Sequence, residues 1–143
     1  MTPDADCILH ASCVAHQGRA VLILGASGSG KSSLALQLMA LGAGLVADDR
    51  TRLTREGHQV IADVPEAISG LIEARGVGIL RADPVGPAPV ALVVSLDENE
   101  SDRLPEKRLF RVLGQSVPLL AGVATPHFPA ALMQMLACGR HSP

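Results

Sequence analysis

A phosphate-loop motif constrains this sequence more than any other feature. Residues 25–32 read GASGSGKS, a complete G-x-x-x-x-G-K-[ST], and they directly follow the apolar run 20–24. An apolar pattern at helical spacing from Ser33 to Leu41 predicts a helix after the motif, which Gly42 ends. Strand, glycine-rich loop and helix in this order are the context that the motif requires. The sequence therefore predicts nucleotide-phosphate binding on an α/β fold.

Each residue type in the motif has a chemical reason. Glycine permits the backbone conformation that turns successive N–H groups toward phosphate oxygens, and the following helix directs the positive end of its dipole at the same anion. The Lys31 ammonium can reach the β and γ phosphates, and the Ser32 hydroxyl can ligate a bridging Mg²⁺. The residues expected to bind ATP are Gly25, Ala26, Ser27, Gly28, Ser29, Gly30, Lys31 and Ser32.

Length and composition narrow the class of protein. A chain of 143 residues is expected to form one domain, 1–143, with an aliphatic core. Two Phe, no Trp or Tyr and a formal charge of −2 argue against a nucleic-acid partner. The polar, acidic residues 1–6 differ from a secretory leader, and the longest apolar stretch is too short to span a membrane. We expect a cytoplasmic protein.

The three cysteines, Cys7, Cys13 and Cys138, are interpreted as reduced, small core hydrophobes. A donor at every third position from Cys7 to His16 resembles the spacing of metal ligands. On a strand, however, the two cysteines would face one way and His10 and His16 the other. This geometry argues against a zinc site.

The first strand, Cys7–Ala15, is expected to form a hairpin with the strand that carries the phosphate loop, which places His10 near the loop. After the helix, residues 45–47 predict a strand parallel to the first in a βαβ unit. Its carboxyl end carries Asp48 and Asp49, where ligands bind in open α/β sheets. The alternative is a solvated turn, and alternation leaves open whether one or both carboxylates face the phosphates.

The middle of the chain is less informative. Residues 50–62 predict an exposed hairpin, Pro65 is expected to open a helix through Ile72, and residues 77–80 predict a short strand. Glu73 and Arg75 could serve metal and phosphate or form an exposed pair.

The last third predicts a buried strand at 90–96, a surface loop at 97–102, a possible edge strand at 115–118 and a helix opened by Pro129. Between this loop and the possible edge strand lie four basic residues, which we interpret as a solvated face. Any one of them could instead reach into a site and stabilise charge there. They are Arg103, Lys107, Arg108 and Arg111.

Two motifs, LVADDR at 45–50 and IEARGVGI at 72–79, together with the phosphate loop and His10, resemble the catalytic domain of HPr kinase/phosphorylase. The resemblance runs from about residue 8 to 104. It implies a P-loop domain of the phosphoenolpyruvate-carboxykinase-like type, a mixed sheet with flanking helices. It also implies ATP- and Mg²⁺-dependent phosphorylation of a serine on the phosphocarrier HPr or an HPr-like protein. Members of that family are oligomeric, so a homo-oligomer is possible.

Residue by residue, the resemblance implies that Glu73 is a second metal ligand beside Ser32. It implies that Asp49 takes the serine proton in the kinase direction and returns it in the reverse reaction. The other active-site residues that it implies are His10, Lys31, Asp48 and Arg103.

The chain departs from the family in two respects. The sequence contains no counterpart of the N-terminal regulatory domain of many members, so we expect a short form of the family. Residues 123–129 contain no arginine, where the family has an arginine-bearing loop tied to phosphorolysis. Inorganic phosphate needs cationic neighbours when it approaches a charged phosphoserine, so this difference argues against the reverse reaction.

Two other functions remain open. One is a nucleotide-binding regulatory interaction module with weak or no turnover, and the other is a small-molecule P-loop kinase. A regulatory GTPase is disfavoured because the sequence contains no Asn-Lys-x-Asp motif.

Overall fold

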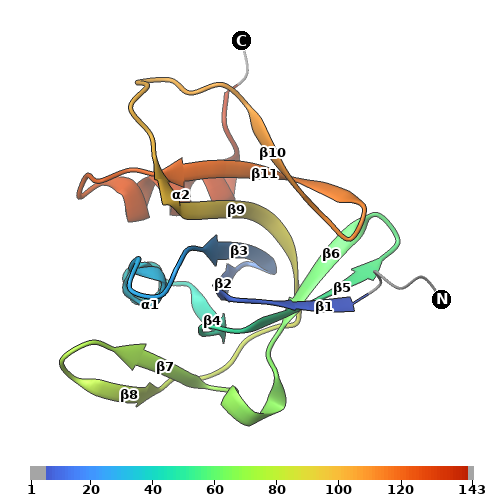
Figure 1. Ribbon diagram of the computed structural model, residues 1–143, viewed down its shortest axis with the longest axis vertical. Coiled ribbons are helices and arrows are strands. Elements are labelled where there is room, and N and C mark those ends of the chain that lie inside the picture. Colours follow the sequence, from blue (N-terminus) through green and yellow to red (C-terminus); the bar gives the residue numbers. More distant parts are fainter. Residues whose placement is uncertain (1–5, 142–143) are drawn as a thin grey trace.

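A curled mixed sheet of nine strands forms the body of the protein, and both helices pack on one of its faces (Figure 1). The computed structural model describes residues 6–141, so residues 1–5 and 142–143 of the expected single domain lie outside it. The strands of this sheet are β1 (Asp6–Leu9), β2 (Ala11–His16), β3 (Arg19–Leu24), β4 (Gly44–Ala47), β5 (Thr51–Glu56), β6 (Gln59–Asp63), β9 (Ala88–Asn99), β10 (Arg108–Val112) and β11 (Gln115–Gly122).

The strand order is β1-β5-β6-β9-β3-β2-β4, with β11 paired to β9 and β10 paired to β11. Of the three strands that pair with β9, β3 and β11 run parallel to it, and β6 pairs antiparallel with its first residues. A separate hairpin consists of β7 (Leu71–Ala74) and β8 (Gly78–Arg81). The helices are α1 (Lys31–Ala40) and α2 (Phe128–Cys138), with a short 3₁₀ turn at Glu66–Ile68.

The hairpin of β2 and β3 forms as predicted. Its turn residues, Gln17 and Gly18, have φ values of 53° and 75°, which suit the twist of a tight antiparallel pair. The expected parallel relation of β3 and β4 is also confirmed, but the two strands are not neighbours. Strand β2 lies between them and pairs antiparallel with both.

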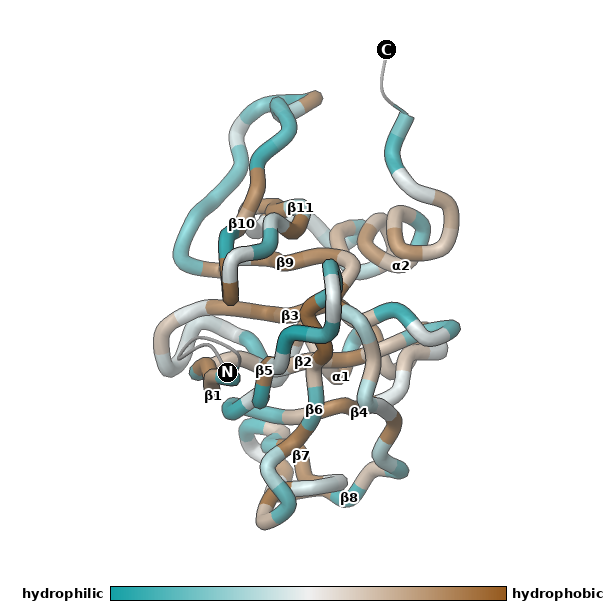
Figure 2. The backbone as a smooth tube through the Cα atoms, turned by 90° about the vertical axis from the view of Figure 1, so that its right-hand side faces the viewer, coloured by the Kyte–Doolittle hydropathy of each residue, from teal (hydrophilic) through white to brown (hydrophobic). Residues whose placement is uncertain are grey.

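Alternating side chains divide the core into two clusters, one on each face of the sheet. On one face, Val21 and Ile23 of β3 pack against α1 and α2. On the other face, Leu22 belongs to a cluster that includes buried side chains of β5 and β6. Figure 2 shows this hydrophobic band along β3 and β9 in the middle of the molecule. The phosphate-loop strand is thus buried on both sides.

The prediction of a helix from Pro65 through Ile72 is wrong. Only a 3₁₀ turn forms, and Gly70, with φ 73°, redirects the chain into β7. Along β7 exposed and buried residues alternate, so that Ile72 and Ala74 face the core. The apolar residues that suggested a helix belong to a turn and a half-buried strand.

Three smaller predictions also need correction. The hairpin of β5 and β6 is not simply exposed, because Leu53 and Val60 are buried in the core. Strand β9 continues to Asn99, through part of the expected surface loop. Strand β11 is longer than the expected edge strand and continues to Gly122: residues 115–118 pair with β10 alone, whereas residues 119–122 pair with β9. The helix opened by Pro129 is confirmed as α2.

Cys13 of β2 is buried in the core and Cys7 of β1 packs against the same cluster, whereas Cys138 is exposed, so the core interpretation is wrong for Cys138. Burial raises the pKa of the fully buried Cys13 thiol. Burial also raises the pKa of Cys7, with a smaller contribution from the charge of Asp6. Both thiols are therefore held in the protonated form, as suits small core side chains.

Across residues 6–141, neither helix has the length and apolar character needed to cross a membrane.

Candidate functional site

A cavity of about 330 Å³ opens where β3 and β4 end. This is the edge of the sheet at which α/β folds bind ligands. The side chains that line it come from the phosphate loop, the start of α1, the end of β4 and the β7–β8 hairpin: Ser27, Gly28, Gly30, Lys31, Ser32, Ser33, Asp48, Asp49, Glu73 and Arg75.

The phosphate loop has the backbone that the motif requires. Gly30 has φ 99°, in the left-handed region, immediately before α1. At Gly25, where the loop begins, a Cβ would lie 2.3 Å from the Ser29 hydroxyl oxygen, so a larger residue would displace that side chain.

Lys31 is almost fully buried, with 6% of its surface exposed. Its ammonium donates to the carbonyl oxygens of Gly25 at 2.7 Å and Ala26 at 3.3 Å. Within residues 6–141 no carboxylate lies within ion-pair distance of it. A buried cation bonded only to carbonyl groups lacks a counter-charge, and an anionic phosphate in the cavity would provide one.

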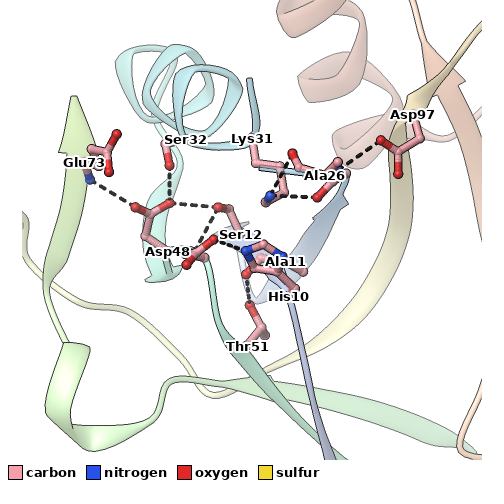
Figure 3. A network of polar contacts seen from close by, with 12 residues as sticks. His10, Ala11, Ser12, Ala26, Lys31, Ser32, Asp48, Thr51, Glu73 and Asp97 are labelled. Carbon is pink, nitrogen blue, oxygen red and sulfur yellow. Dashed lines mark hydrogen bonds and ion pairs between the residues drawn. The ribbon is translucent and has the colours of Figure 1, made fainter. Parts of the chain in front are cut away.

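Strand β9 holds the start of the loop. The Ala26 N–H donates to the Asp97 carboxylate at 3.0 Å (Figure 3). Because β9 runs parallel to β3 as its direct neighbour, its carboxyl end lies beside the loop. Asp97 therefore fixes the first peptide of the loop from the neighbouring strand.

Asp48 is buried and accepts three hydrogen bonds. One carboxylate oxygen, Oδ1, accepts from the hydroxyls of Ser12 at 2.8 Å and Ser32 at 2.7 Å, and Oδ2 accepts from the Glu73 backbone N–H at 3.0 Å (Figure 3). With its proton directed at Asp48, the Ser32 oxygen keeps its lone pairs for a metal ion. Asp48 thus joins α1, β2 and β7 around one carboxylate.

Asp49 has a different environment. Its φ is 68°, and the Arg50 N–H closes a tight turn on the Asp48 carbonyl at 2.8 Å. The Asp49 N–H donates to the Ser12 hydroxyl at 3.1 Å, and its half-exposed carboxylate lies 2.5 Å from His10 Nε2. The turn has begun at Asp49, so both carboxylates line the cavity, one buried and one accessible.

His10 reaches the site from a bend between β1 and β2, which divides the single strand predicted there. His16, the other histidine of the ligand-like spacing, places Nδ1 3.1 Å from the Gly42 carbonyl oxygen at the end of α1. The two histidines and the two core cysteines therefore do not converge.

Ser12 was missed by the sequence analysis. It has no exposed surface and contacts both aspartates. The available signal was a hydroxyl among the apolar residues of a buried strand next to the phosphate-loop strand, since a buried polar group needs partners.

Arg75 lines the cavity, and a Cβ placed on Gly28 would lie 4.0 Å from its guanidinium. It is therefore a neighbour of the phosphate loop, whereas its sequence spacing left an exposed pair open. Arg103 is exposed in the connection between β9 and β10 and is not among the residues that line the cavity.

The sequence model of the HPr Serine kinase C-terminal domain matches residues 4–119, most of the chain. The chain belongs to this family. Its relatives named HPr kinase/phosphorylase include a protein of Caldanaerobacter subterraneus subsp. tengcongensis, 31% identical over 93% of this chain and 48% of the relative. Another, from Alkaliphilus metalliredigens, is 47% identical over 66% of this chain and 33% of the relative. The chain thus spans about half or less of these curated relatives.

A solved structure with a similar fold carries a name from the same family. The HPr(Ser) kinase/phosphatase from Coxiella burnetii has a TM-score of 0.76 and 26% identity, over 92% of this chain and 94% of that one. The expected P-loop-type kinase fold, a mixed α/β sheet with helices, is confirmed for this member of the HPr serine kinase family.

Proposed function

We propose that this chain is an ATP- and Mg²⁺-dependent protein-serine kinase that phosphorylates HPr or an HPr-like phosphocarrier. The observation that carries the proposal is the accessible Asp49 carboxylate in the same cavity as the buried, uncompensated Lys31 ammonium. The Asp49 carboxylate can accept a hydroxyl proton, and the Lys31 ammonium can bind a phosphate. Family membership supports serine as the acceptor.

The residues present fit a nucleotide with its metal. Lys31 and the loop amides would hold the phosphates, and Ser32 and Glu73 would hold Mg²⁺. Within residues 6–141 no three His, Cys, Asp or Glu side chains form a ready-made metal site. Mg²⁺ commonly binds through one or two carboxylates together with substrate phosphates and water, which accords with this donor set. When bound, the metal would neutralise charge on the transferring phosphoryl group.

In this proposal the two aspartates have separate tasks. Asp49 accepts the proton of the substrate serine, and His10 holds the Asp49 carboxylate in place through their 2.5 Å contact. Asp48, which accepts three hydrogen bonds, orients Ser32 and the backbone of Glu73. Ser12 fixes both, since it donates to Asp48 and accepts from the Asp49 N–H.

The guanidinium of Arg75 beside the phosphate loop gives the cavity a second cation for the transferring phosphate. Arg103 would have to move toward the cavity to act there, so its assignment remains a prediction of the resemblance. Phosphorolysis is not part of the proposal, because residues 123–129 offer no arginine for inorganic phosphate.

The test is to incubate the protein with ATP, Mg²⁺ and purified HPr-like proteins and to locate phosphoserine by mass spectrometry. Transfer in the wild type and its loss in Asp49→Asn would support the proposal. The main competing function is a nucleotide-dependent interaction module with weak or no turnover. ATP binding and carrier binding without transfer would establish that function instead, and transfer only to small hydroxyl compounds would indicate a small-molecule kinase.

A further inference from the structure

The β7–β8 hairpin has two unlike faces. Ile72 and Leu80, a cross-strand pair, point toward the core cluster that contains α1. The next pair, Glu73 and Ile79, points to the opposite face, and Glu73 lines the cavity. Figure 1 shows the hairpin standing apart from the main sheet below α1. The face that carries the proposed metal ligand is therefore not covered by the rest of the described chain.

This outer face carries exposed apolar side chains next to the charged Glu73 and Arg81. Ile79 is 64% exposed and Leu71 is 37% exposed, and Val77 in the turn between the strands is 77% exposed. Three of the eight large exposed hydrophobic side chains in residues 6–141 thus lie within this short hairpin. Single exposed apolar residues are common, but several together beside a reaction site usually mark a surface that a partner covers.

The apolar residues continue the wall of the cavity. Ile79 is the direct cross-strand neighbour of Glu73, and Val77 lies two positions after Arg75. Both Glu73 and Arg75 line the cavity. A protein that brings a serine hydroxyl to Asp49 must lie over the mouth of this cavity, so its surface next to that serine would meet the hairpin.

We propose that the outer face of the β7–β8 hairpin, formed by Leu71, Val77 and Ile79, is a docking surface for the phosphocarrier substrate. The partner it fits is a folded protein with an apolar patch beside its acceptor serine. This inference rests on the proposed kinase function and adds where the carrier is held. Apolar contact suits this task, because it contributes affinity without competing with the phosphates for the charged groups in the cavity.

The test uses Ile79→Thr, which keeps a β-branched side chain in the strand but removes part of the apolar surface. Leu109→Thr is the matched control, since Leu109 is 63% exposed on a strand, β10, outside this hairpin and this cavity. Dissociation constants for the carrier are measured by calorimetry with a non-hydrolysable ATP analogue and Mg²⁺, so the result does not depend on turnover. ATP affinity and oligomer mass are measured on the same samples.

We expect Ile79→Thr to weaken carrier binding at least about ten-fold, the effect of losing roughly two buried methylene-sized groups, with ATP affinity unchanged. Leu109→Thr should bind the carrier as the wild type does. Equal carrier binding by Ile79→Thr and the wild type, or equal losses in both variants, would overturn the proposal. A change of oligomer mass confined to Ile79→Thr would also overturn it, because the hairpin would then bind a second copy of the chain.

The two proposals fail in different ways. A wild-type protein that binds the carrier through the hairpin but transfers no phosphate would contradict the kinase function and leave the docking surface supported. A wild-type protein that transfers phosphate while Ile79→Thr binds the carrier normally would contradict the docking surface alone.

Discussion

Ser12, with no exposed surface, donates a 2.8 Å hydrogen bond to the carboxylate of Asp48. The same hydroxyl oxygen accepts the Asp49 N–H at 3.1 Å. Asp49 has a positive φ, a conformation that costs most residues free energy unless neighbouring contacts hold it. The side chain of Ser12 therefore determines how two adjacent carboxylates are presented to one cavity.

Removing this hydroxyl should lower turnover without removing any group that reacts. In Ser12→Ala the Asp49 N–H loses its partner, and we expect kcat to fall about ten-fold while ATP affinity changes little. Amide hydrogen exchange should become faster at Asp49 than in the wild type.

A double-mutant cycle separates positioning from general structure. If Ser12 acts through Asp49, then Ser12→Ala should cost much less activity in the Asp49→Asn background than alone. Fully additive losses would mean that Ser12 only stabilises the fold.

Much of this site could be predicted from sequence, because its central part is encoded by contiguous residues. The phosphate loop and helix α1 are encoded by contiguous residues with strict backbone needs, so Lys31 and Ser32 were identified directly. The sequence placed His10 near the phosphate loop but did not predict its contact with Asp49, because this contact depends on a bend that interrupts the predicted strand. Ser12 gave no motif, since its role exists only once β2 lies beside β4.

The fold was predictable to a similar degree. Strands flanked by clear turns were placed well, whereas the apolar residues from Pro65 to Ile72 suit a helix or a half-buried strand equally by spacing. The cross-strand pairing of β7 with β8 decided between them, and pairing is not a local property. The insertion of β2 between β3 and β4 is a tertiary arrangement of the same kind.

Lys31→Ala is expected to abolish phosphoryl transfer and to weaken ATP binding. The ammonium is the buried positive charge of the cavity, and alanine leaves the phosphates without it. Calorimetric titration with MgATP and a phosphoserine assay measure the two effects. Wild-type affinity and turnover in this variant would contradict the nucleotide site.

Asp49→Asn and Asp48→Asn should differ in kind. Asparagine at 49 cannot take a proton, so phosphorylation should fall about 10²- to 10⁴-fold while MgATP still binds. Asparagine at 48 replaces one acceptor oxygen by a donor among three donors, which should lower the free energy of unfolding by about 1–3 kcal/mol.

Steady-state kinetics and urea unfolding of both variants test this division. A stable, inactive Asp48→Asn beside a fully active Asp49→Asn would reverse the two assignments. Full activity in both would exclude a carboxylate base.

Glu73→Gln should raise the Mg²⁺ concentration needed for half-maximal activity more than it lowers nucleotide affinity. The change removes charge from the metal side of the cavity and leaves Lys31 and the loop amides in place. Activity is titrated with Mg²⁺ at saturating ATP, and Glu66→Gln, at an exposed carboxylate outside the cavity, serves as the control. An unchanged titration would return Glu73 to the class of exposed surface charges.

The stability of the protein should fall at alkaline pH because of Cys13. Burial raises the pKa of this thiol, so the folded state keeps its proton at pH values where the unfolded state loses it. The contribution of this thiol to the free energy of unfolding is constant below its pKa in the unfolded state, about 8.5. It decreases progressively as the pH rises above that value, by about 1.4 kcal/mol at pH 9.5.

Urea unfolding under reducing conditions at pH 7.5 and 9.5 measures this change. Cys13→Ala should show a correspondingly smaller loss between the two pH values, although it retains Cys7 and Cys138. The same pH dependence in both proteins would assign the effect to other groups.

The position of β2 between β3 and β4 has a practical consequence for recognising such domains. A search that defines the domain from its phosphate-loop strand onward would begin at about Arg19 and omit β1 and β2. Such a fragment would keep the whole nucleotide motif and both aspartates, yet it would lack the strand that joins β4, and with it both aspartates, to the rest of the sheet. The recognisable motif is therefore not the minimal folding unit, and gene-fusion or domain-transplant boundaries should be drawn upstream of Asp6.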